Sequence, residues 1–179
     1  MRIIAGLAKG MVLAVPREDV RPTSDRVREA IFSSLGDRVI GADVLDLYAG
    51  TGALGLEAAS RGAKSVTFVE RSSDAIQENL ARFGKYAVCE FEVRRGDVIA
   101  SLKRFGRMFS LVFADPPYAL NPATLLEAVR DRLAPGGVFV LETSKRAKLD
   151  AGLLWELERE AIYGDTRVCY FRAPAIGRH

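Results

Sequence analysis

The stretch that decides the fold is Asp46-Leu47-Tyr48-Ala49-Gly50-Thr51-Gly52. It ends an apolar run over 43–48 and precedes a helical pattern over 53–61, which Gly62 terminates. Together with Gly55, its glycines formally match the GxGxxG spacing. Glycines between a buried strand and a helix let backbone amides approach a ligand at the helix N-terminus. The stretch therefore predicts the ligand-binding turn of an open α/β sheet.

Strand and helix patterns alternate from this stretch to the end of the chain. We predict strands at 43–48, 65–70, 89–94, 109–114 and 138–142, helices at 53–61, 73–83, 98–104 and 122–133, and a terminal hairpin of 154–162 and 166–172 around Tyr163-Gly164-Asp165. Alternating strands and helices predict a parallel sheet with crossover helices, and the terminal hairpin adds an antiparallel strand at its end. The expected fold is α/β and Rossmann-like.

The first 40 residues show a different pattern. Two short apolar runs, 2–5 and 10–15, predict an N-terminal hairpin with a small contribution to the core. Capping residues at 23–25 then predict a helix that Gly36 ends, with Arg26 and Arg28 outside its apolar stripe. Because no long linker interrupts the chain, we predict one domain over 1–179, formed by a basic extension (1–40) and a Rossmann-like core (41–179).

Acidic residues follow three of the predicted strands at the edge where such sheets bind ligands. Asp46 is placed to orient the glycine turn and to hold a cationic amino group, and Glu70 to accept both hydroxyls of a ribose. Asp97, next to Gly96, is placed to accept an adenine amine. S-adenosylmethionine has all of these groups and no phosphate, so it fits better than NAD. Each carboxylate alone is also compatible with a loop cap or a surface charge.

The predicted cofactor-binding residues are Asp46, Tyr48, Gly50, Gly52, Glu70, Gly96 and Asp97.

A second motif, Asp115-Pro116-Pro117-Tyr118, follows the strand at 109–114. The two prolines stiffen the backbone, so the Asp115 side chain and the Pro116 carbonyl can accept both hydrogens of one amino group. Tyr118 can stack on an aromatic ring, and Asp115 through Tyr118 are our predicted catalytic residues. Hydrogen bonds that favour a pyramidal nitrogen free its lone pair for in-line displacement at a sulfonium methyl. The alternative is a purely structural role for the motif, as a proline turn with a surface tyrosine.

The net charge of +3 originates in residues 1–28, which hold six basic and three acidic residues, while the remainder holds twenty of each. We predict that Lys9, Arg21, Arg26 and Arg28 contact RNA phosphates. An ordinary solvated surface would show the same charge pattern.

Composition narrows the class of protein. With 179 residues, of which 49% are hydrophobic and 27% charged, the chain is typical of one globular domain. Cys89 and Cys169 form no metal or disulfide pattern and are expected to be buried, and the single histidine, His179, is the last residue. No metal site is predicted. The chain lacks an apolar run of about 20 residues and a signal-peptide pattern, so we expect a cytoplasmic protein with no membrane contact.

The glycine turn and the Asp-Pro-Pro-Tyr motif resemble those of class I S-adenosylmethionine-dependent methyltransferases acting on exocyclic amines. Further stretches resemble the bacterial small-subunit rRNA guanine-N2 methyltransferases of the RsmD family: Arg2–Gly6, Lys9-Gly10, Arg21–Glu29, Ala53–Ala58 and Tyr163–Thr166. The resemblance covers nearly the whole chain, and the arginine-rich stretch is its most family-specific part. Thr51 stands where many relatives carry Ser, which is also a small hydroxyl residue.

The resemblance implies a seven-stranded sheet with a reversed last strand, S-adenosyl-L-methionine as cofactor, and N2-methylguanosine in 16S rRNA as product. The implied partner is ribosomal RNA, free or in an assembling small subunit, and the expected state is a monomer. Two enzyme alternatives are a DNA adenine or other amine methyltransferase and a nicotinamide oxidoreductase. The first would normally need a recognition domain, and the second leaves Asp115–Tyr118 unexplained. A non-catalytic RNA-binding module would not need Glu70 and Tyr118 together.

Overall fold

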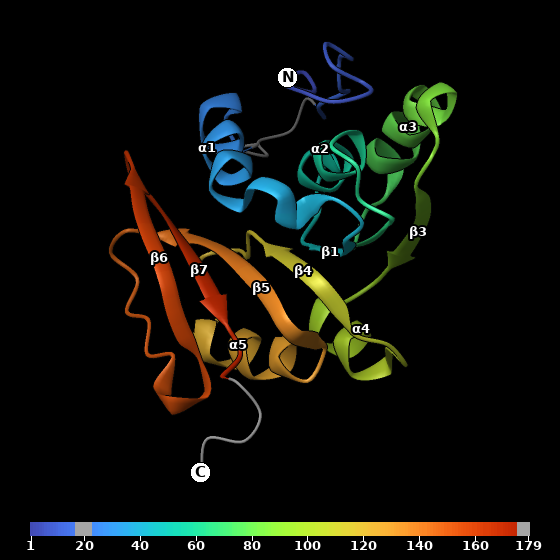
Figure 1. The fold of residues 1–179 in the computed structure, drawn as a ribbon. Coiled ribbons are helices and arrows are strands. Elements are labelled where there is room, and N and C mark those ends of the chain that lie inside the picture. The colour runs from blue at the N-terminus through green and yellow to red at the C-terminus, as the bar shows by residue number, and fades with distance from the viewer. Residues whose placement is uncertain (17–22, 175–179) are drawn as a thin grey trace.

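The computed structural model describes residues 1–16 and 23–174, except for the side chain of Leu153. Strands and helices alternate along it (Figure 1). The helices are α1 (Asp25–Leu35), α2 (Ala53–Ser60), α3 (Asp74–Phe83), α4 (Val98–Arg104) and α5 (Pro122–Arg130). The strands are β1 (Asp43–Leu47), β2 (Ser65–Glu70), β3 (Glu90–Arg95), β4 (Phe109–Ala114), β5 (Leu133–Ser144), β6 (Glu156–Tyr163) and β7 (Thr166–Arg172). Short 3₁₀ turns span Gly36–Val39, Gly84–Tyr86 and Gly152–Leu154.

These seven strands form one sheet in the order β3-β2-β1-β4-β5-β7-β6. The pairs from β3 to β5 are parallel, whereas β7 runs antiparallel to both of its neighbours. The predicted mostly parallel α/β sheet with a reversed last strand is therefore confirmed. The order of strands changes direction between β1 and β4, and ligand crevices of open sheets lie at such a switch point.

Two boundaries near β5 differ from the prediction. The strand begins at Leu133 instead of 138, and α5 ends at Arg130 instead of 133. Leu133 already pairs with Phe109, and the register then shifts before Leu111 pairs with Val138. The Pro-Gly-Gly segment at 135–137 is thus an irregularity inside the strand, which its turn-forming composition alone does not reveal.

Helices cover both faces of the sheet. Figure 1 shows α1, α2 and α3 on one face and α4 and α5 on the other. On the first face, Phe32 of α1 packs on Phe113 of β4 with ring centroids 5.6 Å apart. On the second, Trp155 packs on Phe139 at 5.7 Å and donates its indole N–H to the Leu126 carbonyl of α5 at 3.2 Å. Two apolar clusters, one on each face, therefore form the core.

The two cysteines, Cys89 and Cys169, are buried and unpaired, as predicted. Among residues 1–16 and 23–174, no helix has the length and apolar character that crossing a membrane requires.

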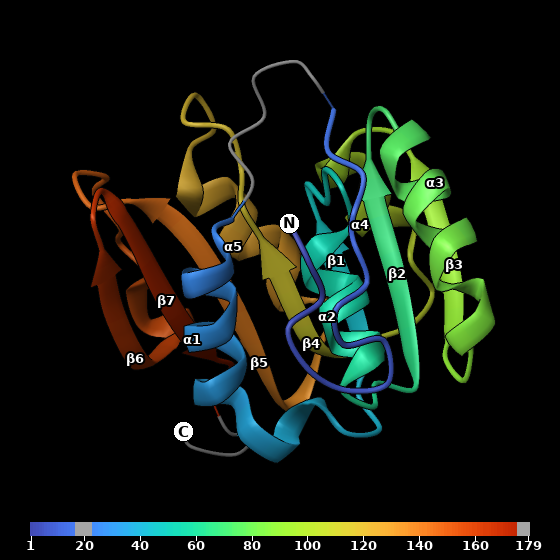
Figure 2. The same cartoon turned by 90° about the horizontal axis from the view of Figure 1, so that it is seen from above.

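The N-terminal segment, residues 1–16, pairs its two apolar runs as the predicted hairpin, although neither run is a regular strand. An antiparallel bridge joins Arg2 to Val12, and backbone hydrogen bonds of 2.8–3.0 Å link Ile3 to Gly10 and Met11 and link Met1 to Leu13. The segment runs alongside α2 (Figure 2). Side chains of the core hold it in place, since backbone amides of the segment donate to Glu57, Ser60 and Asn79 at 2.7–3.1 Å. Ile3, Ala8 and Leu13 are at most 3% exposed. The expectation of a small core contribution was therefore wrong.

Arg28 is the clearest correction to the predicted arm. Ser24 caps α1 and the helix ends before Gly36 as predicted, but Arg28 is fully buried beneath the N-terminal segment. Its Nη2 donates to the Arg2 carbonyl at 2.7 Å and to the Asp25 carboxylate at 2.6 Å, and its Nη1 lies 4.0 Å from Glu57 Oε2. The apolar spacing in the sequence identified one buried face of α1. It could not show that the N-terminal segment packs over a second face of this helix. A fully buried guanidinium cannot contact RNA phosphates, so Arg28 is not supported as an RNA-binding residue.

Replacing Arg28 by Gln should lower the free energy of unfolding by about 3 kcal/mol, because the buried Glu57 loses a nearby cation and the Arg2 carbonyl loses its donor. Arg26→Gln is the matched control, since Arg26 is two residues away on the same helix and exposed; it should change stability by less than about 0.5 kcal/mol. Denaturant unfolding of both variants measures the difference. Equal, small effects would show that the buried contacts of Arg28 carry no stability.

Candidate active site

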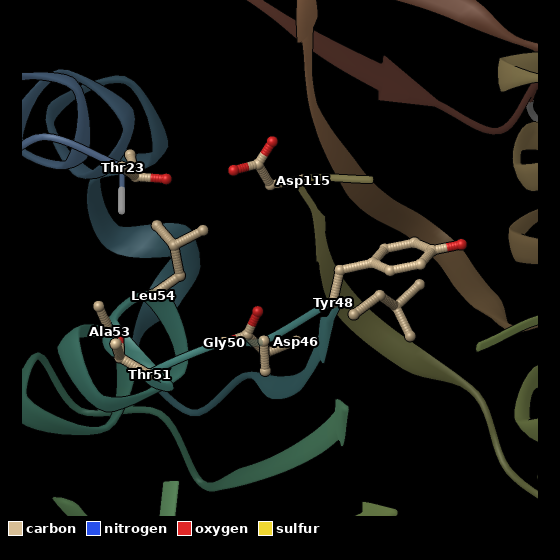
Figure 3. A pocket seen from close by; sticks show the side chains of 10 residues that line it. Thr23, Asp46, Tyr48, Gly50, Thr51, Ala53, Leu54 and Asp115 are labelled. Carbon is tan, nitrogen blue, oxygen red and sulfur yellow. The ribbon is translucent and has the colours of Figure 1, made fainter. Parts of the chain in front are cut away.

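The carboxyl ends of β1, β2 and β4 meet at an open cleft of about 980 Å³. A smaller pocket of about 50 Å³ adjoins it at the end of β1 (Figure 3). The predicted residues that line the cleft are Tyr48, Gly50, Glu70, Gly96, Asp97, Asp115, Pro116, Pro117 and Tyr118. Asp46 lines the smaller pocket. Gly52 lines neither; it is the N-cap residue that precedes α2, with a φ of 80°. The structure thus brings both predicted motifs to one cavity.

The glycine turn is held by two carboxylates. The Gly55 amide donates to Asp46 Oδ2 at 2.9 Å, and the Gly50 amide donates to Glu70 Oε2 at 2.8 Å. Gly50 has open space where a side chain would begin, whereas a Cβ on Gly55 would lie 2.5 Å from the Phe68 ring. The first glycine therefore leaves room beside the cleft, and Gly55 permits close packing of α2 on the sheet.

Tyr48 has the only positive φ, 54°, among the non-glycine residues that the structure describes. This left-handed backbone costs about 1–2 kcal/mol, and such conformations concentrate at functional sites. Burial, the largest cause, raises the pKa of the Tyr48 hydroxyl to about 12, so it is protonated at neutral pH. The bend at Tyr48 directs the chain from β1 into the glycine turn.

Glu70 and Asp97 line the outer wall of the cleft. The second oxygen of Glu70 accepts the Arg71 amide at 2.9 Å, so backbone hydrogen bonds fix both carboxylate oxygens. Asp97 caps α4 by accepting the Ala100 amide at 2.9 Å and lies 3.6 Å from the exposed Arg71 guanidinium. Each oxygen of Glu70 keeps a second lone pair, so the carboxylate can still accept hydrogen bonds from a ligand.

Three carboxyl groups gather at the ends of β1, β4 and β5 because of the strand register. Ala114 pairs with both Leu47 and Leu141, which places Asp46, Asp115 and Glu142 at neighbouring positions. Burial, with the nearby Glu70 and Asp115 charges, raises the pKa of Asp46 to about 8 against the opposing effect of the Gly55 hydrogen bond. This group of acids would attract a positively charged ligand.

Glu142 is a site residue that the sequence analysis missed. It is 4% exposed, and the Thr23 hydroxyl donates to its two oxygens at 2.9 and 3.0 Å. Burial, followed by the charge of Asp115, raises the pKa of Glu142 well above its usual range. A glutamate inside the apolar run 138–142 is the signal that could have found it, since a charge at a buried strand position needs a reason.

Asp115 and Glu142 share a hydrogen bond between their carboxyl groups. The residue Asp115 is exposed as a whole, but desolvation of its carboxyl raises its pKa, while the bond from Glu142 opposes the rise. We interpret the pair as a protonated Glu142 that donates to an ionised Asp115, because Glu142 is the more deeply buried of the two. Asp115 and Thr23 both project into the small pocket (Figure 3).

The Asp-Pro-Pro-Tyr loop (115–118) is anchored behind its aromatic ring. The Leu120 amide donates to the Pro117 carbonyl at 3.0 Å, and Asn121 caps α5 by accepting the Ala123 amide at 3.0 Å. Tyr118 itself is 83% exposed. A ring held at a cleft mouth with its faces unpacked is available to stack on a flat ligand.

The predicted RNA-binding residues have different surroundings. Lys9 and Arg26 are exposed, while Arg28 is buried as described above. Arg21 lies outside the described residues.

Residues 1–172 match the family described as Conserved hypothetical protein 95, which is that of the RsmD proteins. The chain belongs to this family. It is 32% identical to Ribosomal RNA small subunit methyltransferase D of Escherichia coli K12, over 99% of this chain and 92% of that protein. It is 36% identical to the Haemophilus influenzae protein of the same name, over 92% and 89%. The resemblance to the RsmD family seen in the sequence is therefore confirmed.

The solved structure of E. coli yhhF superposes on this RsmD-family chain with a TM-score of 0.84 at 30% identity, covering 98% of both chains. The fold is that of class I methyltransferases.

The buried Asp46 should make stability depend on pH. Its pKa is about 8 in the folded chain against 3.8 usually, so its contribution favours folding at low pH and is lost as pH rises toward 8. Asp46→Asn keeps an acceptor for the Gly55 amide and should remove this pH-dependent loss of stability. Relative to the parent, the variant should gain about 4 kcal/mol in unfolding free energy between pH 5 and pH 8.5, because about three pH units separate pH 5 from the folded pKa. Denaturant unfolding at both values measures this; a difference that stays constant with pH would contradict it.

Proposed function

We propose that this protein is an S-adenosylmethionine-dependent methyltransferase that methylates the exocyclic amine (N2) of a specific guanine in 16S rRNA. The observation that carries the proposal is the stiff Asp-Pro-Pro-Tyr loop, which faces the same cleft as the glycine turn and its carboxylates. Its relatives named as small-subunit rRNA methyltransferases support the same activity.

The cofactor site is supported by the charge of the cleft. Burial, followed by the charges of neighbouring carboxylates, raises the pKa values of Asp46 and Glu142, and a cation bound there would relieve the repulsion among these groups. S-adenosylmethionine carries an ammonium and a sulfonium, whereas the pyrophosphate of NAD would bring negative charge to the same carboxyls. The amino-acid end would bind near Asp46 and Gly50, and the ribose would bind Glu70. The adenine would lie near Gly96 and Asp97, with Tyr48 and Gly52 shaping the turn.

The chemistry at the loop needs acceptors more than a strong base. When bound, the cofactor supplies a methyl group on a positively charged sulfur. The Asp115 carboxylate and the Pro116 carbonyl would accept the two hydrogens of the guanine amine and aim its lone pair at that methyl group. As the nitrogen–carbon bond forms and the sulfur–carbon bond breaks, the amine becomes positively charged. Its proton can then pass to Asp115, whose raised pKa suits this acceptance.

Pro117 would keep the loop stiff, and the exposed Tyr118 would stack on the base. A guanine inside a helix hides its amine, so the target must be single-stranded or turned out of its stack. Lys9, Arg21 and Arg26 would bind RNA phosphates on the arm side.

We treat residues 1–179 as one methyltransferase domain in which the extension (1–40) and the core (41–179) share apolar contacts. We further propose that it works as a monomer in the cytoplasm, on rRNA or on an assembling small subunit.

The decisive experiment uses 16S rRNA and small subunits from a strain that lacks the gene for this protein. The purified protein with labelled S-adenosylmethionine should restore one N2-methylguanosine, which mass mapping of nuclease fragments locates. A methyl group on adenine, or activity on DNA instead of RNA, would favour the amine-methyltransferase alternative. Tight NAD binding with no response to S-adenosylhomocysteine would favour an oxidoreductase and sink the proposal.

Glu70→Ala should weaken S-adenosylhomocysteine binding by about 1–3 kcal/mol, because charge-assisted hydrogen bonds to the ribose are lost. Glu70→Gln removes the charge but keeps one acceptor oxygen, so it distinguishes the loss of charge from a loosened glycine turn. Its affinity for S-adenosylhomocysteine should lie between those of the parent and the Ala variant. Calorimetry measures all three affinities. Unchanged affinity in the Ala variant would place the ribose elsewhere.

Asp115→Ala should reduce single-turnover methylation of rRNA by roughly 10²-fold or more while cofactor affinity persists, since the acceptor acts on the reacting amine. Glu142→Gln retains a donor toward Asp115 and should keep most of the turnover. Near-normal turnover of the Asp115 variant would show that the acceptor lies elsewhere.

Tyr118→Ala should weaken RNA capture by about 1–3 kcal/mol through lost stacking, and Tyr118→Phe, which keeps the ring, should be mild. Rapid-quench methylation over a range of RNA concentrations separates binding from chemistry. Equal damage in the two variants would show that the hydroxyl, not the ring, is what the site uses.

A further inference from the structure

A cluster of positive charge lies beyond the acceptor loop, on the turn that follows β5. This turn, residues 144–148, contains Lys145, Arg146 and Lys148, all of them exposed. It belongs to the part of the chain whose total charge is balanced, so overall composition gives no hint of it. It is also separate from the N-terminal arm in sequence.

Hydrogen bonds from neighbouring backbone and side chains hold the turn in one conformation. The Ser144 hydroxyl accepts the Arg146 amide at 3.2 Å, and the Ser144 carbonyl accepts the Ala147 amide at 3.0 Å. The Lys145 amide donates to the Asp165 carbonyl of the β6–β7 hairpin at 2.9 Å, and Arg167 of β7 donates to the Ala147 carbonyl. The cations on this turn are therefore presented from a fixed backbone.

The three cations differ in their partners. Lys145 lies 3.3 Å from the Asp165 carboxylate, so its charge is partly compensated. Within residues 1–16 and 23–174, no carboxylate lies within 4.0 Å of the Arg146 or Lys148 side-chain nitrogens. These two charges remain available to an anionic ligand.

The turn shares a hollow with the acceptor loop. This hollow has a volume of about 130 Å³ and is lined on one side by Asp115–Tyr118 and on the other by Thr143, Ala147 and Lys148. Tyr118 also lines the large cleft, so the loop separates the two cavities. A nucleotide whose base stacks on Tyr118 therefore brings its sugar and phosphate to the rim of this hollow.

We propose that Arg146 and Lys148 bind the phosphodiester beside the target nucleotide, and so hold the RNA strand while its base enters the cleft. The inference rests on the proposed function. A guanidinium binds a phosphate through two parallel hydrogen bonds, and an ammonium adds a point charge, so the pair suits a single phosphodiester. Such contacts position a strand without reading its sequence.

The test compares the parent with the double variant Arg146→Gln/Lys148→Gln. A matched control is Lys103→Gln/Arg104→Gln, which removes the same charge from exposed residues at the end of α4, near the opposite edge of the sheet. Binding to the target-site RNA is measured between 50 and 200 mM salt, together with KM and kcat for methylation and the affinity for S-adenosylhomocysteine.

In the 146/148 variant, the slope of log affinity against log salt should fall by about 1 to 2, as expected for the loss of two phosphate contacts. KM for RNA should rise roughly tenfold, kcat at saturating RNA should stay within about twofold, and cofactor affinity should not change. The control should keep the parent slope and KM.

An unchanged slope and KM in the 146/148 variant, or an equal loss in both double variants, would overturn this site while leaving the proposed function intact. Failure of the unmodified protein to methylate any RNA would instead overturn the proposed function, and this inference with it. Both double variants change only exposed side chains, so each should fold normally. Thermal unfolding of each variant checks this.

Discussion

The hydrogen bond from the Gly55 amide to the buried Asp46 carboxyl is the contact on which the rest of the site depends. It ties the first turn of α2 to the end of β1, and this fixes where the glycine turn between them can lie. The position of this turn brings the Gly50 amide to the Glu70 carboxylate. It also requires the left-handed conformation of Tyr48. A neutral side chain could accept the same amide, so the hydrogen bond alone does not explain an acid at this position. The acid costs stability at neutral pH because burial raises its pKa to about 8, so folding requires the carboxylate to bind a proton. Such a cost is typical of a residue retained for binding.

The parallel register of β1, β4 and β5 adds a second constraint. It brings one carboxyl from each strand end to neighbouring positions, so their charges cannot be adjusted independently. In the free site burial, followed by repulsion from neighbouring carboxylates, raises the pKa values of Asp46 and Glu142, and a cationic ligand would favour their ionised forms. Charge therefore discriminates between ligands of similar size: a cofactor with two positive groups lowers the energy of this cleft, and one with a pyrophosphate raises it. The glycine turn alone, whose spacing also matches dinucleotide sites, could not make this distinction.

Most of the fold could be predicted from the sequence, because its strands and helices are marked by local patterns. The buried strands are apolar runs. Residues that favour helix N-termini mark the starts of three helices, α1, α4 and α5, at Ser24, Asp97 and Asn121. The acceptor loop and the glycine turn were placed correctly because both lie at strand ends. Arg28, Glu142 and the N-terminal segment were not, since their environments come from contacts across long sequence separations. Glu57 accepts amides more than 50 residues away, and Thr23 donates to a residue 119 positions later. Apolar periodicity does not carry such information.

These long-range contacts also change how the N-terminal region is understood. Its charge and pattern predicted RNA contact and a small contribution to the core, yet its backbone is hydrogen-bonded to Glu57, Ser60 and Asn79 in α2 and α3. Thr23, just before α1, donates a hydrogen bond to Glu142, one member of the carboxyl pair. Asn79 connects both roles, because its amide group bonds Ala14 of the segment and the Thr51 carbonyl of the glycine turn. The N-terminal region is thus part of the wall of the cleft, which Thr23, Ser24 and Val27 line. The region that carries the proposed RNA contacts Lys9 and Arg26 therefore also supports the residues that line the cleft, through the Thr23–Glu142 and Asn79–Thr51 hydrogen bonds.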